Sequence, residues 1–128
     1  MSYTLEWKNL TSLDQLESII EDSREKPALV FKHRLTAEES VQAMEVLERD
    51  WSIPDDQLDC YIVDVMENKA IAAELSEFAG IPNAFPQVLL FADGVAMYDE
   101  SHEMINVKKI KLALKIINRT FRWMETRV

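Results

Sequence analysis

The sequence contains very little cysteine. Cys60 is its only thiol in 128 residues. A single cysteine excludes an internal disulfide, a CxxC redox pair and a cysteine-rich zinc site. Cys60 begins an apolar, β-branched segment, and no Lys, Arg or His stands next to it to lower the pKa of the thiol. We therefore expect Cys60 to be a small buried hydrophobic side chain rather than a reactive group.

Glycine, proline and long apolar runs are also scarce. Two glycines and four prolines leave little room for linkers, so residues 1–128 are predicted to form one domain. No apolar run approaches the length of a membrane span. The first ten residues, MSYTLEWKNL, lack the apolar stretch of a signal peptide. These absences predict a cytoplasmic protein.

Positive charge is in short supply as well. The 14 Lys and Arg residues are outnumbered by 23 Asp and Glu residues, which gives a formal net charge of −9. An excess of negative charge repels phosphate backbones and anionic lipid surfaces. We therefore expect neither nucleic acid nor a membrane as a partner.

Alternating strand and helix patterns predict a mixed α/β fold. Apolar or alternating residues predict strands at residues 3–7, 28–33, 60–65, 88–91 and 95–98. Segments with apolar residues at helical spacing precede, separate and follow the longer strands. The Asp93-Gly94 pair predicts a tight hairpin between the last two strands. Strands joined through a helix are expected to be parallel.

Several helix starts are marked by side chains that can cap the first backbone N–H groups. Ser12 with Gln15 and Thr36 with Glu39 each have the spacing of a capping box. Asn106 precedes the last amphipathic segment and is the expected cap of that helix.

Four stretches give the chain a resemblance to a known family. They are WKNLTSLDQLESIIEDSREKPALVFKH, YIVDVMENKAIAAELSEFAGI, FPQVLLFADG and YDESHEMI. In this order and spacing they resemble the YtxJ-like family, the monothiol bacilliredoxins of the thioredoxin superfamily, from about Trp7 to about Ile110. The resemblance implies a single-domain, thioredoxin-like α/β fold with an extra N-terminal helix. It also implies thiol-disulfide exchange in chains that keep the family's cysteine.

The position of that cysteine is the main departure from the family pattern. In the family the attacking thiol lies where the helix after the strand at residues 28–33 begins, and backbone N–H groups and the helix dipole there stabilise a thiolate. This chain has Ala37 at that point, followed by Glu38 and Glu39. Of the family's Cys-Pro-Ile-Ser, only the serine remains, as Ser40. The implied chemistry therefore lacks its nucleophile.

The second departure lies in FPQVLLF. The resemblance places Pro86 where the superfamily has a cis-proline at the start of the third strand, so we expect a cis Phe85–Pro86 bond. In this superfamily the backbone before that proline pairs with an extended peptide or a thiol ligand. Phe85 replaces the family's serine. Its ring either widens an apolar groove or fills it, and the sequence leaves both options open.

Other catalytic constellations are weak in this sequence. The resemblance brings His33 and His102 to the active-site end of the fold, but no third ligand has suitable spacing, so neither a metal site nor a cofactor is predicted. No G-x-S-x-G occurs, which argues against an α/β-hydrolase. Glu38 and Glu39 are adjacent in a first helical turn, where acids commonly face the helix dipole rather than serve as a catalytic pair.

The sequence therefore predicts a redox-inactive thioredoxin-fold protein that acts as a binding or regulatory module and not as an enzyme. The groove expected to bind is lined by His33, Thr36, Ala37, Phe85, Pro86 and His102. The expected partner is a protein or peptide, with a low-molecular-weight thiol as a second candidate. The alternative is a thiol-disulfide oxidoreductase that removes bacillithiol from proteins, in line with the family, and that acts with a partner's cysteines. A purely structural role in a dimer or complex is a third interpretation.

Overall fold

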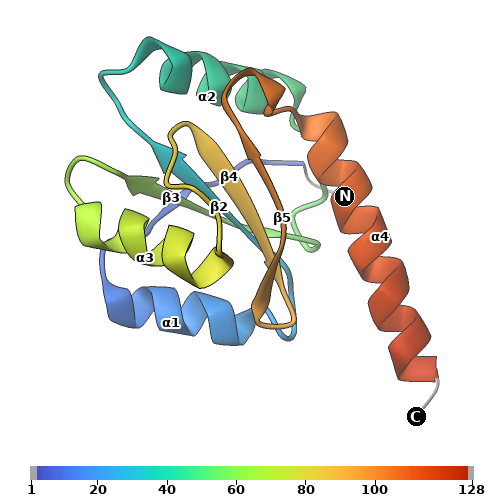
Figure 1. The fold of residues 1–128 in the computed structure, drawn as a ribbon. Coiled ribbons are helices and arrows are strands. Elements are labelled where there is room, and N and C mark those ends of the chain that lie inside the picture. Colours follow the sequence, from blue (N-terminus) through green and yellow to red (C-terminus); the bar gives the residue numbers. More distant parts are fainter. Residues whose placement is uncertain (1–2, 127–128) are drawn as a thin grey trace.

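A five-stranded sheet lies between two layers of helices (Figure 1). The computed structural model describes the backbone of residues 3–126 and the side chains of residues 3–120. The strands are β1 (Lys8–Asn9), β2 (Ala28–His33), β3 (Asp59–Asp64), β4 (Gln87–Ala92) and β5 (Val95–Ser101). The helices are α1 (Leu13–Asp22), α2 (Glu38–Asp50), α3 (Lys69–Ala79), the short 3-10 helix η1 (His102–Met104) and α4 (Val107–Thr126). The predicted α/β class is confirmed.

The sheet has the strand order β1-β3-β2-β4-β5. β1 and β2 each pair in parallel with β3, whereas β4 pairs antiparallel with both β2 and β5. Val30 at the centre of β2 lies opposite Tyr61 of β3 and Leu89 of β4. The parallel pairing expected for two strands joined through a helix is confirmed, as is the final hairpin.

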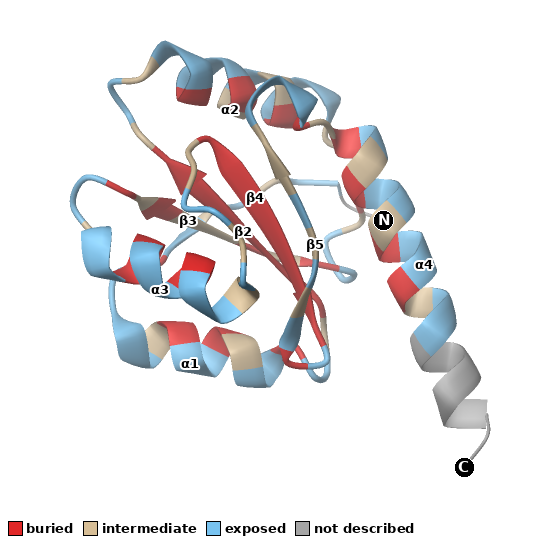
Figure 2. Cartoon of the chain, in the orientation of Figure 1, coloured by how far each residue is buried: buried red, intermediate tan, exposed pale blue. Residues whose placement is uncertain are grey.

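Both faces of the sheet are buried, which explains the continuous apolar runs in the central strands. Leu29 and Phe31 belong to the core beneath α2 and α4, and Val30 belongs to the core beneath α1 and α3. Figure 2 shows β2 and β4 buried along their whole length and the helices exposed along their outer sides. Among the described residues, no helix is long and apolar enough to cross a membrane.

Two of the predicted helix caps are present. Ser12 Oγ accepts a hydrogen bond from the Gln15 backbone N–H at 3.1 Å, while Gln15 Oε1 accepts from the N–H of Thr11 at 2.9 Å. Asn106 Oδ1 accepts from the N–H of Lys109 at 2.9 Å. These side chains satisfy backbone donors that have no partner within the helix.

The predicted Asp93-Gly94 turn connects β4 and β5. Asp93 has φ 53° and Gly94 has φ 78°. Positive φ at both central residues is the type I′ geometry that suits the twist of a two-residue hairpin, and glycine adopts it without steric cost. The turn is tied to the end of α1, since Asp93 N donates to the Ser23 carbonyl and Gly94 N donates to Ser23 Oγ.

The predicted edge strand at residues 3–7 is wrong, because pairing begins only at Lys8 in β1. The segment before β1 is held by one ring contact and one hydrogen bond instead of by strand pairing. The Trp7 ring packs against Phe31 with ring centroids 5.5 Å apart. Thr4 N donates to Asp55 Oδ1 at 2.7 Å, so a long-range polar contact replaces the strand ladder there.

Candidate functional site

The predicted groove residues come from three segments that meet at one end of the sheet. β2 ends at His33, and the chain turns there into α2. β4 runs antiparallel to β2, so its start lies beside the end of β2, with Gln87 opposite Lys32. Gln87 also lies opposite Ser101 at the end of β5, which leads directly into η1. The sheet topology therefore brings the start of α2, the Phe85–Pro86 loop and His102 to the same end (Figure 1).

The Phe85–Pro86 peptide bond is cis, as the resemblance led us to expect. The Pro86 carbonyl accepts a hydrogen bond from the N–H of His102 at 3.0 Å, and His102 has φ 57°. Two of the predicted site residues are therefore joined through their backbones. The Phe85 backbone makes no hydrogen bond with another described residue.

The Thr36–Glu39 capping box is wrong. α2 begins one residue later than the box requires, so its N-cap is Ala37, with φ −94°, ψ 124° and no side-chain hydrogen bond. The two polar side chains take other partners. Thr36 Oγ1 accepts from Arg34 Nε at 3.3 Å, and Glu39 Oε2 lies 2.9 Å from Nδ1 of His102. A local partner for Thr36 and a tertiary partner for Glu39 thus replace the capping box.

A buried serine holds the turn before α2. Ser40 Oγ accepts a hydrogen bond from the Arg34 backbone N–H at 3.2 Å, and the Arg34 carbonyl accepts from the N–H of Ala37 at 3.0 Å. Ser40 is fully buried. The serine that survives from the family pattern therefore fixes the turn in place of a conventional cap.

Arg34 also joins the two sides of the predicted groove. Its guanidinium carbon lies 5.8 Å from the centroid of the Phe85 ring. A cation over an aromatic face is attracted by the ring quadrupole. Because the same guanidinium donates to Thr36, it is held from its own turn while it covers a ring of the opposite loop. The sequence did not point to Arg34, which has no special spacing.

His33 lies behind the surface rather than on it. Its side chain is buried, and its ring packs against Phe31 with centroids 5.3 Å apart. Burial lowers the pKa of His33, and the negative charge of Asp64 opposes that effect. Its Nδ1 atom has no hydrogen-bond partner among the described residues. A neutral imidazole behind the turn is the form that these surroundings favour.

The most unusual group at this end is Lys32, which sequence reasoning missed. Lys32 is fully buried, and its Nζ donates to Ser76 Oγ at 2.7 Å, to Asn83 Oδ1 at 2.5 Å and to Gln87 Oε1 at 3.1 Å. All three acceptors are neutral, and burial lowers the pKa of Lys32 to about 8. A lysine within the buried strand at residues 28–33 was the available signal. Its partners lie 44 to 55 residues away, so no local pattern could name them.

The only thiol lies away from this site. Cys60 pairs with Leu29 near the start of the parallel strands, whereas the site is at their carboxyl ends. Burial raises the pKa of Cys60 from 9.0 to about 12, and the charge of Asp59 adds to the effect. The predicted burial of this cysteine is confirmed. Among residues 3–120, no group of three or more His, Cys, Asp or Glu side chains is arranged to hold a metal ion.

A cis-proline beside the start of a helix, on a sheet of this order, defines the class of thioredoxin-fold proteins, and solved structures agree. A candidate oxidoreductase with a thioredoxin fold matches with TM-score 0.68 and 27% identity, over 82% of this chain and 90% of that one. Thioredoxin Mala s 13 of Malassezia sympodialis matches with TM-score 0.69 and 20% identity, over 91% and 95%. Mitochondrial thioredoxin 3 of Saccharomyces cerevisiae matches with TM-score 0.66 and 17% identity, over 85% and 93%.

Within that class, residues 8–110 match the family model described as monothiol bacilliredoxin BrxC, and the chain belongs to this family. The match confirms the resemblance inferred from the four sequence stretches. No match was found among curated proteins.

Proposed function

We propose that the chain is a member of its family without the active-site thiol, and that it binds a partner and does not itself exchange disulfides. One observation carries the proposal. The helix start that would activate a sulfur presents the methyl group of Ala37, and the chain's only thiol, Cys60, is buried with a pKa raised to about 12. Thiol-disulfide exchange requires an accessible thiolate that attacks a disulfide in line. Ala37 has no sulfur, and the Cys60 thiol is buried and is not ionised near neutral pH.

The binding role rests on what surrounds Ala37. The Phe85 backbone has free hydrogen-bonding groups among the described residues, which an extended peptide can pair with as an added strand. The guanidinium of Arg34 and the ring of Phe85 lie together beside that backbone. A peptide carrying an acidic or aromatic side chain suits this pair, because the guanidinium attracts a carboxylate and stacks on a ring. The buried Lys32 Nζ donates a hydrogen bond to Asn83 Oδ1 and thereby anchors the loop that contains Phe85.

The catalytic part of the proposal is tested by a disulfide-reduction assay. The protein is expected not to accelerate reduction of insulin, or of mixed disulfides with low-molecular-weight thiols, beyond the uncatalysed rate. A thioredoxin assayed alongside is the positive control. Turnover that disappears in Cys60→Ser would contradict the proposal and would favour the oxidoreductase role that the family name implies.

The binding part is tested by affinity capture from a lysate of the native cell. Phe85→Asp is expected to lose the partner retained by the wild type, because a carboxylate replaces the ring and neutralises Arg34. Val95→Asp, at an exposed apolar position in the β4–β5 hairpin at the opposite end of the sheet, is the matched control and should retain it. Equal capture by Phe85→Asp and the wild type would remove the groove from consideration.

A further inference from the structure

Positive charge is concentrated on one element of an acidic chain. Residues 107–128 contain seven of the 14 Lys and Arg residues and one of the 23 Asp and Glu residues, a net charge of +6. Residues 1–106 contain the other seven cations and 22 acids, a net charge of −15. Most of the first segment forms α4, so the helix carries a charge opposite to that of the rest of the molecule.

The outer side of α4 presents these cations around exposed apolar side chains. Leu112 and Ile116, one helical turn apart, are 59% and 57% exposed. Lys108, Lys115 and Arg119 surround them, and within residues 3–120 none of the three has a carboxylate within ion-pair distance. Unpaired cations next to exposed apolar side chains are typical of a surface that contacts an acidic, partly apolar partner.

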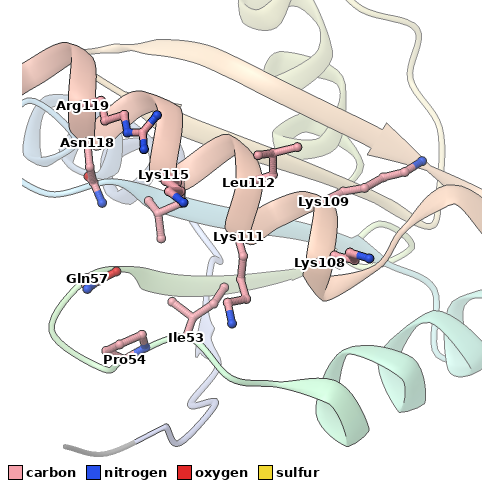
Figure 3. A pocket seen from close by; sticks show the side chains of 11 residues that line it. Ile53, Pro54, Gln57, Lys108, Lys109, Lys111, Leu112, Lys115, Asn118 and Arg119 are labelled. Carbon is pink, nitrogen blue, oxygen red and sulfur yellow. The ribbon is translucent and has the colours of Figure 1, made fainter.

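Leu112 and the three cations line a hollow of about 770 Å³ (Figure 3), whereas Ile116 lies on the neighbouring side of α4, in a smaller hollow shared with Met97 and Tyr98 of β5. The other wall of the larger hollow is the loop after α2, with Ile53 and Pro54. Lys111 points from α4 toward this loop in Figure 3, and its Nζ donates to Ser52 Oγ at 3.2 Å. The cation-bearing face of α4 forms one wall of the larger hollow, so the helix is a raised ridge beside it, and such a ridge suits a hollow on a partner more than a flat membrane.

A surface of opposite charge lies on the other face of the sheet. α1 and α3 enclose a hollow of about 460 Å³ lined by Leu13, Leu16, Glu17, Ile20, Glu74 and Phe78. Leu13 and Phe78 are 48% and 45% exposed. Apolar side chains thus lie between Glu17 and Glu74, just as those of α4 lie among its cations. The two surfaces match in polarity and are opposite in charge.

We propose that the outer face of α4 in one copy of this chain docks on the α1–α3 hollow of a second copy. Leu112 and Ile116 would pack against Leu13 and Phe78, while the α4 cations approach the two acids. The two surfaces lie on opposite faces of the sheet, with α4 in one core layer and α1 and α3 in the other. The contact is therefore head-to-tail, and in an open assembly it leaves one copy of each surface free at the ends.

The association is expected to be weak and sensitive to salt. Each whole copy carries a net charge of −9, which opposes the local attraction between the docking surfaces. One helix seated in a shallow hollow is a small interface, so we expect a dissociation constant on the order of 10–100 μM at low salt. Sedimentation velocity should show a mass that rises above 14.8 kDa with protein concentration and falls back when salt is added.

Charge exchange provides the decisive test. Lys115→Glu with Arg119→Glu should be monomeric, and Glu17→Lys with Glu74→Lys should be monomeric, because each double variant has like charges on its two docking surfaces. An equimolar mixture of the two double variants should associate, since every contact between unlike copies then joins opposite charges. Glu45→Lys with Glu48→Lys, on the exposed side of α2, makes the same charge change elsewhere and should leave wild-type association intact.

Three results would overturn the proposal. The wild type could remain monomeric up to about 1 mM at low salt, where a contact in the expected range would be populated. The two double variants could fail to associate when mixed although each is folded by circular dichroism. The wild type could instead bind vesicles of phosphatidylglycerol through Lys115 and Arg119 without self-association, which would assign the α4 surface to a membrane.

Discussion

Native Cys60 is expected to react with an aromatic disulfide reagent about a thousandfold more slowly than Cys60 in the unfolded chain. The reactive species is the thiolate. With a pKa raised from 9.0 to about 12, the thiolate at pH 8 falls from about one molecule in ten to about one in ten thousand. Steric burial of the sulfur slows the reaction further. Absorbance of the released thiol, in native buffer and in guanidinium chloride, measures both rates.

A matched control separates burial from the reagent's own properties. Ala37→Cys in a Cys60→Ser background places the thiol at the start of α2, where the residue is only half-buried. Glu38 and Glu39 oppose the thiolate there while the helix dipole favours it by about 0.3–1 kcal/mol, so we expect a rate within about tenfold of the unfolded chain. If native Cys60 reacted as fast as this control, the only thiol would be available to chemistry, and the proposal that the chain does not exchange disulfides would fail.

Lys32 is expected to make the free energy of unfolding rise between pH 8 and pH 10.5. Its pKa is lowered from 10.5 to about 8 in the folded protein. Between these two values the unfolded chain holds a proton that the folded chain has released, so raising the pH favours the folded state. Below pH 8 the cost of burying the charge is present in full, and it disappears by pH 10.5. A shift of this size corresponds to about 3 kcal/mol.

Urea unfolding of the wild type and Lys32→Met at pH 7.5 and pH 10.5 measures this effect. The stability of the wild type relative to Lys32→Met should increase by about 3 kcal/mol across the interval. Burial raises the pKa values of Cys60, Tyr61 and Tyr98, which act in the opposite direction, but all three residues remain in both proteins and cancel in the comparison. Lys69→Met, an exposed lysine of α3, is the control. An unchanged difference at the two pH values would contradict the assignment.

The site keeps the geometry of its class while it lacks the sulfur. The cis Phe85–Pro86 bond, the helix start at Ala37 and the adjacent His102 are all in place. What differs is the chemistry of the surface between them, where Arg34 stacks on Phe85 and a methyl group replaces a thiol. The proposed binding role depends on this backbone frame and on these side chains alone.

Much of the fold could be predicted because its signals are local. A continuous apolar run at residues 28–31 predicts the strand at residues 28–33. Asp93-Gly94 predicts the hairpin, because these residues tolerate the backbone conformations that a two-residue turn requires. Ser12 and Asn106 cap helices through backbone groups three residues away. Such contacts depend on residue types at fixed short spacings. Thr36 and Glu39 have the same spacing, but their side chains contact Arg34 and His102 and do not cap α2.

For the candidate site, only the arrangement of the backbone could be predicted from the sequence. The sequence determined the fold class, the helix start without a thiol and, through the family resemblance, the position of the cis-proline. Only the tertiary structure decided the side-chain partners: His102 with Glu39 across 63 residues, Lys32 with Gln87 across 55, and Arg34 with Phe85. His33 is buried because it follows Phe31 by two residues and faces the same core. These contacts form where the antiparallel β4 brings distant segments to one end of the sheet. No local spacing of residues in the sequence predicts which side chains come together there.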